Sequence, residues 1–192
     1  LFAHAAARGW GMDLLLHRTC GPELNRTRRF YHSGETSDLA LLLARVTAEF
    51  PRAPLGAVGV SLGGNVLLKH LGEQGTALPA ALRAAVAVSV PYDLARGSRH
   101  LQRGFSRVYE RHFLRTLVRK VHRKLAVHPD LVARERLGAL RTLWDFDDVV
   151  TGPVHGFAGA ADYYGRSSSL RVLGGVRVQT LLLSAVDDPF LP

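Results

Sequence analysis

The stretch Leu55-Gly-Ala-Val-Gly-Val-Ser-Leu-Gly-Gly64 decides how this chain folds, because it joins a strand pattern directly to a helical pattern. Residues 55–60 form a short apolar run, which predicts a buried strand, and residues 62–71 have the spacing of a helix. Ser61 lies between them. Such an arrangement requires a sharp turn that leaves the Ser61 hydroxyl at the carboxyl edge of a sheet, beside the positive end of the helix dipole. The stretch therefore predicts that Ser61 is a nucleophile.

The pattern Gly59-x-Ser61-x-Gly63 has a chemical interpretation and a purely structural alternative. In the chemical interpretation, the Leu62 N–H is one donor of an oxyanion hole, and such a donor stabilises a transition state by ~2.7–4 kcal/mol. The two glycines would leave room for neighbouring elements to pack closely. In the alternative, the pattern is an ordinary glycine-rich turn. The strand before it and the helix after it favour the nucleophile.

Apolar runs and helical patterns alternate on both sides of this turn. We expect further strands over residues 11–17, 84–90 and 179–185, and a helix capped by Ser33 or Thr36. The second of these runs is almost wholly apolar, which is typical of a strand covered on both faces. Strands that alternate with helices predict an α/β fold with a doubly wound, mostly parallel sheet.

Length and composition agree with one folded domain, since 192 residues are present, of which 47% are hydrophobic and 21% charged. No apolar stretch reaches the ~18 residues of a membrane-spanning helix, and the single cysteine, Cys20, excludes a disulfide framework. The chain begins at Leu1 and stops at Pro192, so we expect residues 1–192 to form one partial domain, truncated at both ends. Residues 93–165, which lie between the last two strands, are expected to form a helical, cap-like insertion.

Two adjacent acids, Asp187 and Asp188, end the final strand pattern, where a catalytic acid that follows the nucleophile is expected. Adjacent carboxylates repel one another, so one of them is expected to point toward the site. Asp188 is preferred because Asp188-Pro-Phe-Leu-Pro192 has the form of a common acid turn; Asp187 is the alternative, and a third possibility is that both only cap a helix. A serine nucleophile also needs a base, usually a histidine held by the acid. All nine histidines precede Asp187, so the triad is expected to be incomplete within these residues.

One histidine motif is a decoy. His155-Gly-Phe-Ala-Gly159 imitates the H-G-x-x-G loop that supplies oxyanion donors in esterases. That loop belongs upstream of the nucleophile, whereas this segment lies far downstream. It is therefore expected to pack at the start of a helix beside the sheet.

Several motifs, taken together and in this order, resemble the YheT-like branch of the α/β-hydrolases. They are Tyr31-His-Ser-Gly-Glu-Thr36, Gly59-Val-Ser-Leu-Gly-Gly-Asn-Val-Leu-Leu-Lys69, Phe146-Asp-Asp-Val-Val-Thr-Gly-Pro-Val-His-Gly-Phe157, Asp162-Tyr-Tyr164 and Asp187-Asp-Pro-Phe190. The resemblance covers almost the whole chain. It implies an α/β-hydrolase fold, hydrolysis of carboxylic or lipid esters, and a Ser–Asp–His triad in which Ser61 is the nucleophile and Asp188 the acid.

The chain also departs from that family in two respects. The family's early strands with their oxyanion loop, and its closing strand with the catalytic histidine, are absent from these residues. The loop Arg18-Thr-Cys-Gly21 is shorter than the Arg-Gly-Cys-Ser-Gly of relatives, which leaves the substrate preference open.

Arginines recur at every fourth residue from Arg99 to Arg123, within a chain of net charge +9. A step of four residues drifts by ~40° on a helix, so the seven arginines are expected to wind around much of one helix. They predict either a weak association with an anionic membrane surface or, more simply, a solvated face. Nucleic acid is not an expected partner, because no recognisable module and no interleaved stacking aromatics are present.

These patterns predict a serine hydrolase that cleaves carboxylic esters, of short- or medium-chain acids or of lipids, through an acyl-serine intermediate. An acyltransferase or thioesterase would use the same nucleophile, and a catalytically incomplete relative would bind a lipid or a partner. The expected substrate is a small-molecule ester. No cofactor or metal is expected, since His112 and His122 have no acidic or cysteine companions. No targeting segment is visible, and a cytoplasmic location is the expectation.

Overall fold

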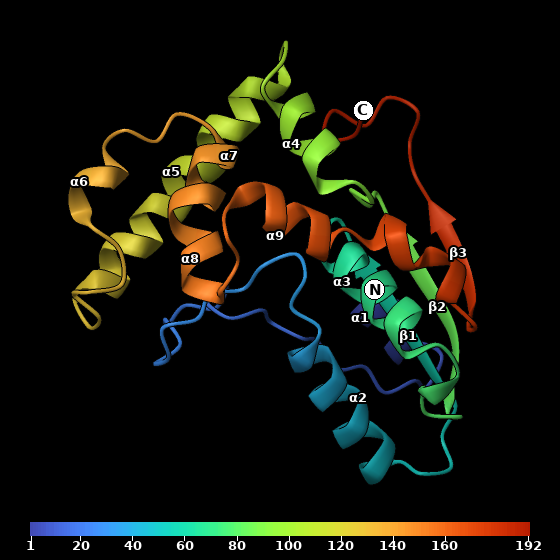
Figure 1. The fold of residues 1–192 in the computed structure, drawn as a ribbon. Coiled ribbons are helices and arrows are strands. Elements are labelled where there is room, and N and C mark those ends of the chain that lie inside the picture. Colours follow the sequence, from blue (N-terminus) through green and yellow to red (C-terminus); the bar gives the residue numbers. More distant parts are fainter.

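The computed structural model describes residues 1–192 and contains a small parallel sheet whose strands lie in the order β1-β2-β3 (Figure 1). The strands are β1 (Leu55–Val60), β2 (Leu82–Val88) and β3 (Gln179–Leu183). The register aligns Val58 with Val86, and Val86 with Leu181. Parallel strands need a crossover, and α3 (Leu62–Gln74) carries the chain from β1 back to the start of β2. The predicted α/β class is therefore confirmed.

Helices make up most of the remaining chain. The other α-helices are α1 (Phe2–Ala6), α2 (Ser37–Glu49), α4 (Leu94–Leu101), α5 (Ser106–Leu125), α6 (Arg134–Leu137), α7 (Leu143–Phe146), α8 (Gly152–His155) and α9 (Ala160–Ser167). The 3-10 turns η1 (Gly75–Ala77) and η3 (Ser169–Gly175) and the π-helix η2 (Asp147–Thr151) complete the elements. No helix combines the length and the apolar character that a membrane crossing requires.

The sheet is covered on one face and open on the other, which corrects the prediction of a doubly wound sheet within these residues. The covered face packs against α2 and α3 through one core cluster, which comprises Leu43, Leu67, Leu71, Leu82 and Ala85. Because side chains alternate along a strand, Val58 and Val60 point to the opposite face, where each is at least 50% exposed. β2 was expected to be covered on both faces, but on the open face Ala84 is exposed and Val86 and Val88 are only half-buried.

Residues 11–17 do not form the predicted strand. They run as irregular chain, and Leu14 and Leu16 are both more than 60% exposed. An apolar run becomes a strand only where a neighbouring strand pairs with its backbone. In this structure the free edge of β1 has no such neighbour, so the run stays unpaired although its composition favours a strand.

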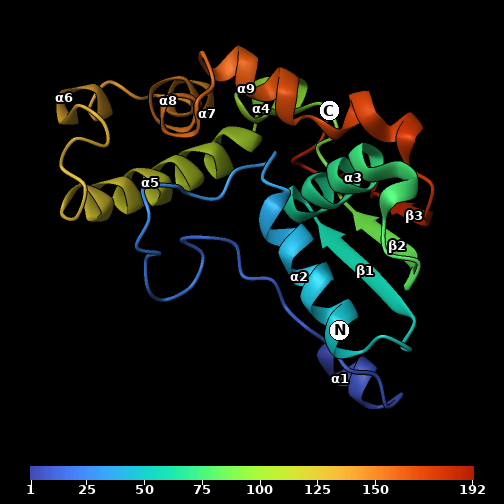
Figure 2. The same ribbon diagram turned by 60° about the horizontal axis from the view of Figure 1, so that its bottom comes forward.

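The long block between β2 and β3 is helical, as predicted, and lies beyond the carboxyl ends of the strands (Figure 2). Its core also takes in Phe30 of the N-terminal loop; the other members are Leu114, Val121, Leu125, Leu131, Leu137, Leu140, Phe146 and Val150. The arginine series does not lie on one helix, which corrects the prediction. Gly104 has φ +51°, a conformation that favours glycine, and the turn around it separates α4 from α5.

Lys124 fastens the N-terminal loop to this block. Its side chain is almost fully buried, and Nζ donates to the carbonyl oxygens of Asn25 and Arg29 at 3.1 Å each and to that of Thr27. Burial lowers the pKa of the ammonium. Three carbonyl acceptors compensate the charge in place of water, so the loop before Phe30 is held in one position.

Candidate active site

Ser61 occupies the sharp turn that the sequence predicted. It is the residue before α3, with φ 52° and ψ −120°, a backbone conformation that a non-glycine residue adopts only under strain. The surrounding hydrogen bonds hold it there. The Ser61 N–H donates to the Val88 carbonyl at 2.8 Å, and the Ser61 carbonyl accepts from Gly64 and Asn65 at 3.0 and 3.1 Å. The turn is thus fixed to β2 on one side and to the first turn of α3 on the other.

Close packing at this turn depends on Gly59 and Gly64. A Cβ on Gly59 would lie 2.6 Å from the Gly63 carbonyl oxygen, and one on Gly64 would clash with Cγ2 of Val90. Gly63 was expected to serve the same purpose, but a Cβ there would meet only Nε2 of His17, at 3.8 Å, which is ordinary contact distance. The turn therefore requires glycine at Gly59, in the strand, and at Gly64, in the helix, but not at Gly63.

Leu62, the predicted oxyanion donor, is the first residue of α3. N–H groups in the first turn of a helix have no carbonyl partner inside the helix. The Leu62 amide, next to Ser61, therefore has no partner within α3, and Leu62 is not among the residues that line the Ser61 cavity described below. Its side chain lines a second, smaller cavity together with Phe30, His32 and Phe146.

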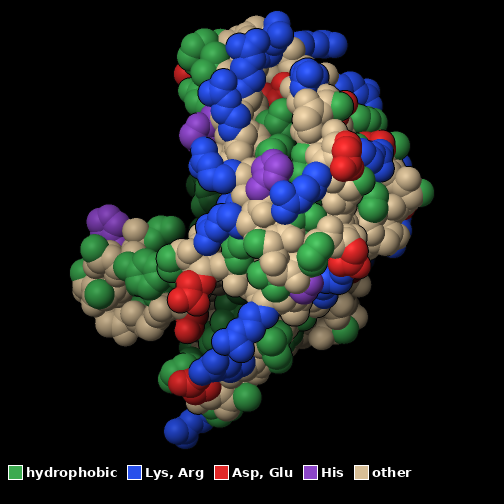
Figure 3. Space-filling model, turned by 90° about the vertical axis from the view of Figure 1, so that its left-hand side faces the viewer, with side chains coloured by type: hydrophobic (Ala, Val, Ile, Leu, Met, Phe, Trp, Pro, Cys, Tyr) green, Lys and Arg blue, Asp and Glu red, His purple; other side chains and the backbone are tan.

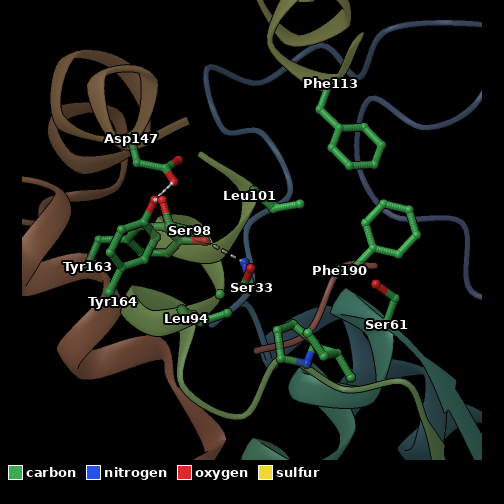
Figure 4. A pocket seen from close by; sticks show the side chains of 13 residues that line it. Ser33, Ser61, Leu94, Ser98, Leu101, Phe113, Asp147, Tyr163, Tyr164 and Phe190 are labelled. Atoms are coloured by element: carbon green, nitrogen blue, oxygen red, sulfur yellow. Dashed lines mark hydrogen bonds between the residues drawn. The ribbon is translucent and has the colours of Figure 1, made fainter. Parts of the chain in front are cut away.

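The exposed Ser61 side chain lines a cavity of about 180 Å³ between the end of the sheet and the helical block. Figure 4 shows Ser61 beside Phe190, with Phe113 near them and a group of polar side chains on the other side of the cavity. The lining residues are Ser33, Ser61, Pro91, Leu94, Gly97, Ser98, Leu101, Phe113, Asp147, Tyr163, Tyr164, Phe190 and Leu191. The nucleophile predicted from sequence is therefore accessible and faces a mixed, largely apolar space.

Asp147 forms the polar wall of this cavity, and the sequence analysis did not single it out. Its carboxylate accepts from the Tyr164 hydroxyl at 2.5 Å and from the Thr151 hydroxyl at 2.6 Å. Burial raises the pKa of Asp147 to about 6, and the two hydrogen bonds oppose that rise. Burial also raises the pKa of Tyr164. The signal in the sequence was the Phe146-Asp-Asp segment, which was noted only as part of the family resemblance.

The two candidate acids lie in the turn that follows β3. Asp187 is exposed; Asp188 is half-buried, and its Oδ1 accepts from the Phe190 N–H at 2.9 Å. Neither is among the residues that line the cavity, although Phe190 and Leu191 are. The structure thus brings the segment after Asp188, rather than Asp188 itself, into contact with the space around Ser61.

No histidine lines the Ser61 cavity. His155 is the last residue of α8, and the segment from His155 to Gly159 connects α8 to α9. The Nε2 atom of His155 accepts a hydrogen bond from the Phe30 N–H at 3.3 Å, so this histidine has a packing role. The His155 ring lies 4.5 Å from that of His32. Burial lowers the pKa of His32 to about 3 and that of His155 to about 4. Both rings are therefore neutral near pH 7.

Comparisons with known proteins show which sequences this chain is similar to. The chain is 43% identical to "Putative esterase YheT" of Escherichia coli over 190 residues, which cover 97% of the chain and 55% of that protein. It is 29% identical to "Monoacylglycerol lipase" of Saccharomyces cerevisiae over 181 residues, 91% of the chain and 40% of that protein. It is 32% identical to "Phospholipase ABHD3" of Mus musculus over 169 residues, 86% of the chain and 40% of that protein.

The turn at Ser61 and these relatives together define the class of protein: the chain is an α/β-hydrolase. Within that superfamily it belongs with the YheT-like branch. The chain spans about half the length of the relatives it matches. No family model matches the chain, and no solved structure does.

Proposed function

We propose that the protein is a serine esterase that hydrolyses carboxylic esters, with Ser61 as its nucleophile. The observation that carries the proposal is the strained Ser61 turn, which presents an exposed hydroxyl to a cavity at the end of a parallel sheet. An ordinary glycine-rich turn would not need a serine at positive φ. The names of the relatives, which include esterases and lipases, support ester hydrolysis as the reaction class.

In the proposed reaction the Ser61 oxygen attacks the ester carbonyl carbon and gives its proton to a base. The carbonyl oxygen becomes an oxyanion, which the Leu62 N–H and the positive end of the α3 dipole stabilise. The bond to the leaving alcohol then breaks as the base returns the proton to it. Water attacks the acyl-serine in the same way and releases the acid, which restores Ser61.

We propose Asp188 as the acid of the triad, with Asp187 as the alternative. The half-buried position of Asp188 supports it, and so do Phe190 and Leu191, which bring its turn to the cavity. By the resemblance, the base is a histidine that follows the acid in the chain. Since residues 1–192 cover about half of the related proteins, we place that histidine in a part of the protein outside these residues.

A fluorophosphonate probe tests the nucleophile on the full-length protein. We expect the probe to label the wild type, and Ser61→Ala to lose both the label and the hydrolysis of p-nitrophenyl butyrate. Ser184→Ala changes an exposed serine just after β3 and should retain both. Labelling that survives in Ser61→Ala would assign the nucleophile to another residue.

We also propose that α5 associates weakly with anionic membrane surfaces. Five exposed arginines, none of them in an ion pair, lie on this helix: Arg107, Arg111, Arg115, Arg119 and Arg123. Four steps of ~40° spread them over ~160° of its circumference, so within α5 they share one broad face. The only acid on the helix, Glu110, is buried and accepts from the Leu143 N–H. Figure 3 shows basic side chains over much of this side of the molecule.

Vesicle co-sedimentation tests this association. We expect binding to phosphatidylglycerol vesicles that weakens with added salt, and no binding to phosphatidylcholine. The combined substitutions Arg111→Gln, Arg115→Gln and Arg119→Gln should abolish it. A control with the same charge change, made at exposed arginines outside the helical block (Arg45→Gln, Arg52→Gln and Arg83→Gln), should keep it. Equal loss in both variants would mean that only net charge matters.

A further inference from the structure

The cavity beside Ser61 has two chemically different ends. Ser61, Phe113 and Phe190 lie together on one side, while Asp147 and Tyr164 lie on the other (Figure 4). The aromatic side accommodates hydrocarbon. The opposite side contains a carboxylate and several hydroxyl groups, which are costly to bury unless they have hydrogen-bond partners. One cavity thus offers an apolar region at the nucleophile and a polar region away from it.

The polar end has hydrogen-bonding capacity that the protein does not use. Oδ1 of Asp147 accepts a hydrogen bond from Thr151 and Oδ2 accepts one from Tyr164, whereas a carboxylate has about four acceptor sites. The Ser98 hydroxyl lies 3.2 Å from the Tyr164 hydroxyl and retains further lone pairs. The Tyr163 hydroxyl accepts the Ser33 N–H at 2.9 Å, so its own proton remains to be donated. Acceptors and a donor therefore converge on the same space.

The backbone around Asp147 also differs from ordinary helix. Asp147 begins η2, a π-helix, and its side chain reaches Thr151 four residues later. π-helical turns are rare and occur frequently at functional sites. The wider turn, together with the bonds to Thr151 and Tyr164, orients the carboxylate without neutralising it by a cation, since Asp147 forms no ion pair. A carboxylate held in this way is suited to accept hydrogen bonds from the hydroxyl groups of a ligand.

We propose that Asp147, Ser98 and Tyr163 form a hydroxyl-binding subsite for the alcohol part of the substrate. The inference rests on the proposed esterase function of Ser61. With the acyl chain against Phe113 and Phe190, the alcohol part of the ester extends toward Asp147. The preferred substrates are then esters whose alcohol carries a further free hydroxyl group, as in a monoester of glycerol, rather than esters of simple alkyl alcohols.

Two esters of equal chain length test the subsite on the full-length protein. Glycerol 1-monobutyrate and propyl butyrate have the same acyl group and the same three-carbon alcohol, and they differ only in two hydroxyl groups. We expect wild-type kcat/KM to favour the glycerol ester by about 10-fold or more, since a hydrogen bond to a charged group is stronger than one between neutral groups. Asp147→Asn should remove most of that preference by raising KM for the glycerol ester, with propyl butyrate changed less than about 3-fold.

Matched variants separate binding from a structural effect. Asp148→Asn alters the next residue, an exposed acid that does not line the cavity, and should keep the preference. Ser98→Ala should lower it by a smaller factor than Asp147→Asn, because only a neutral hydrogen bond is lost. Equal losses of activity on both esters in Asp147→Asn would assign Asp147 a purely structural role and overturn the proposal, as would a wild type that does not discriminate.

A binding measurement distinguishes failure of the subsite from failure of the proposed function. Calorimetry with Ser61→Ala should detect glycerol 1-monobutyrate binding about 10-fold tighter than propyl butyrate, and Ser61→Ala combined with Asp147→Asn should lose the difference. If the wild type hydrolyses neither ester and takes no fluorophosphonate label, the esterase proposal fails while the binding result still decides the subsite. Equal binding of both esters to Ser61→Ala refutes the subsite, whatever the activity.

Discussion

The Asn65 side chain donates to the Ser33 carbonyl at 2.8 Å and so ties the N-terminal loop to the helix that follows the nucleophile. The same Nδ2 donates to the Ser167 carbonyl at 2.8 Å, and Oδ1 accepts from the Ser169 N–H at 2.9 Å. Asn65 is fully buried. One amide therefore joins three segments that lie far apart in the sequence, and one of them contributes Ser33 to the cavity of Ser61.

Asn65→Ala should destabilise the protein strongly. The substitution leaves two carbonyl groups and one N–H without partners in a buried place, and each such group costs about 1–3 kcal/mol. We expect the free energy of unfolding, measured by urea denaturation, to fall by about 3 kcal/mol. Gln74→Ala removes an exposed amide from the end of the same helix and should change it by less than about 0.5 kcal/mol. Similar values for the two variants would refute the bridging role.

The glycines of the nucleophile turn should differ in their tolerance of alanine. Gly59→Ala places a Cβ 2.6 Å from the Gly63 carbonyl oxygen, which is backbone and cannot move aside. We expect a loss of about 2 kcal/mol or more in unfolding free energy. Gly63→Ala meets nothing closer than 3.8 Å and should be nearly neutral or slightly stabilising, because alanine favours helix. Thermal melts of the two variants are the measurement, and a reversed order would contradict the packing described.

Asp147 should make stability depend on pH in an identifiable window. Its pKa rises from 3.8 to about 6 on folding, so the folded state favours the protonated acid. The contribution to stability is fully present below pH 3.8 and is lost as pH rises to about 6. Two pKa units correspond to about 3 kcal/mol. Denaturation of the wild type and of Asp147→Asn at a series of pH values should show the wild type losing about that much relative to the variant, and parallel curves would argue against the raised pKa.

Lys124 should matter far more than its neighbour Lys120. Lys124→Met keeps the buried stem but leaves three carbonyl groups of the Asn25–Arg29 loop without a donor. We expect a loss of about 2–3 kcal/mol in unfolding free energy and faster amide hydrogen exchange in that loop. Lys120→Met alters a half-buried lysine of the same helix that lies over the Tyr31 ring, and it should cost about 1 kcal/mol or less. Unchanged exchange in Lys124→Met would show that other contacts hold the loop.

Some features of the fold follow from short stretches of sequence. Residues 55–71 determine their strand, turn and helix locally, because an apolar run, a turn of small residues and a helical pattern follow one another directly along the chain. The same reasoning failed at residues 11–17, whose composition is as apolar. Whether such a run becomes a strand depends on a neighbouring strand elsewhere in the chain that pairs with it. In this structure the free edge of β1 is unpaired.

The sequence by itself determined the nucleophile candidate, since Ser61 and the elements that strain it are adjacent along the chain. Only the tertiary structure decided what faces that serine. Asp147, Tyr164 and Ser98 are separated by 17 and 66 residues, yet they share hydrogen bonds at one end of its cavity. Spacing in sequence carries no information about such a cluster, because side chains that distant meet only through the packing of α4, η2 and α9.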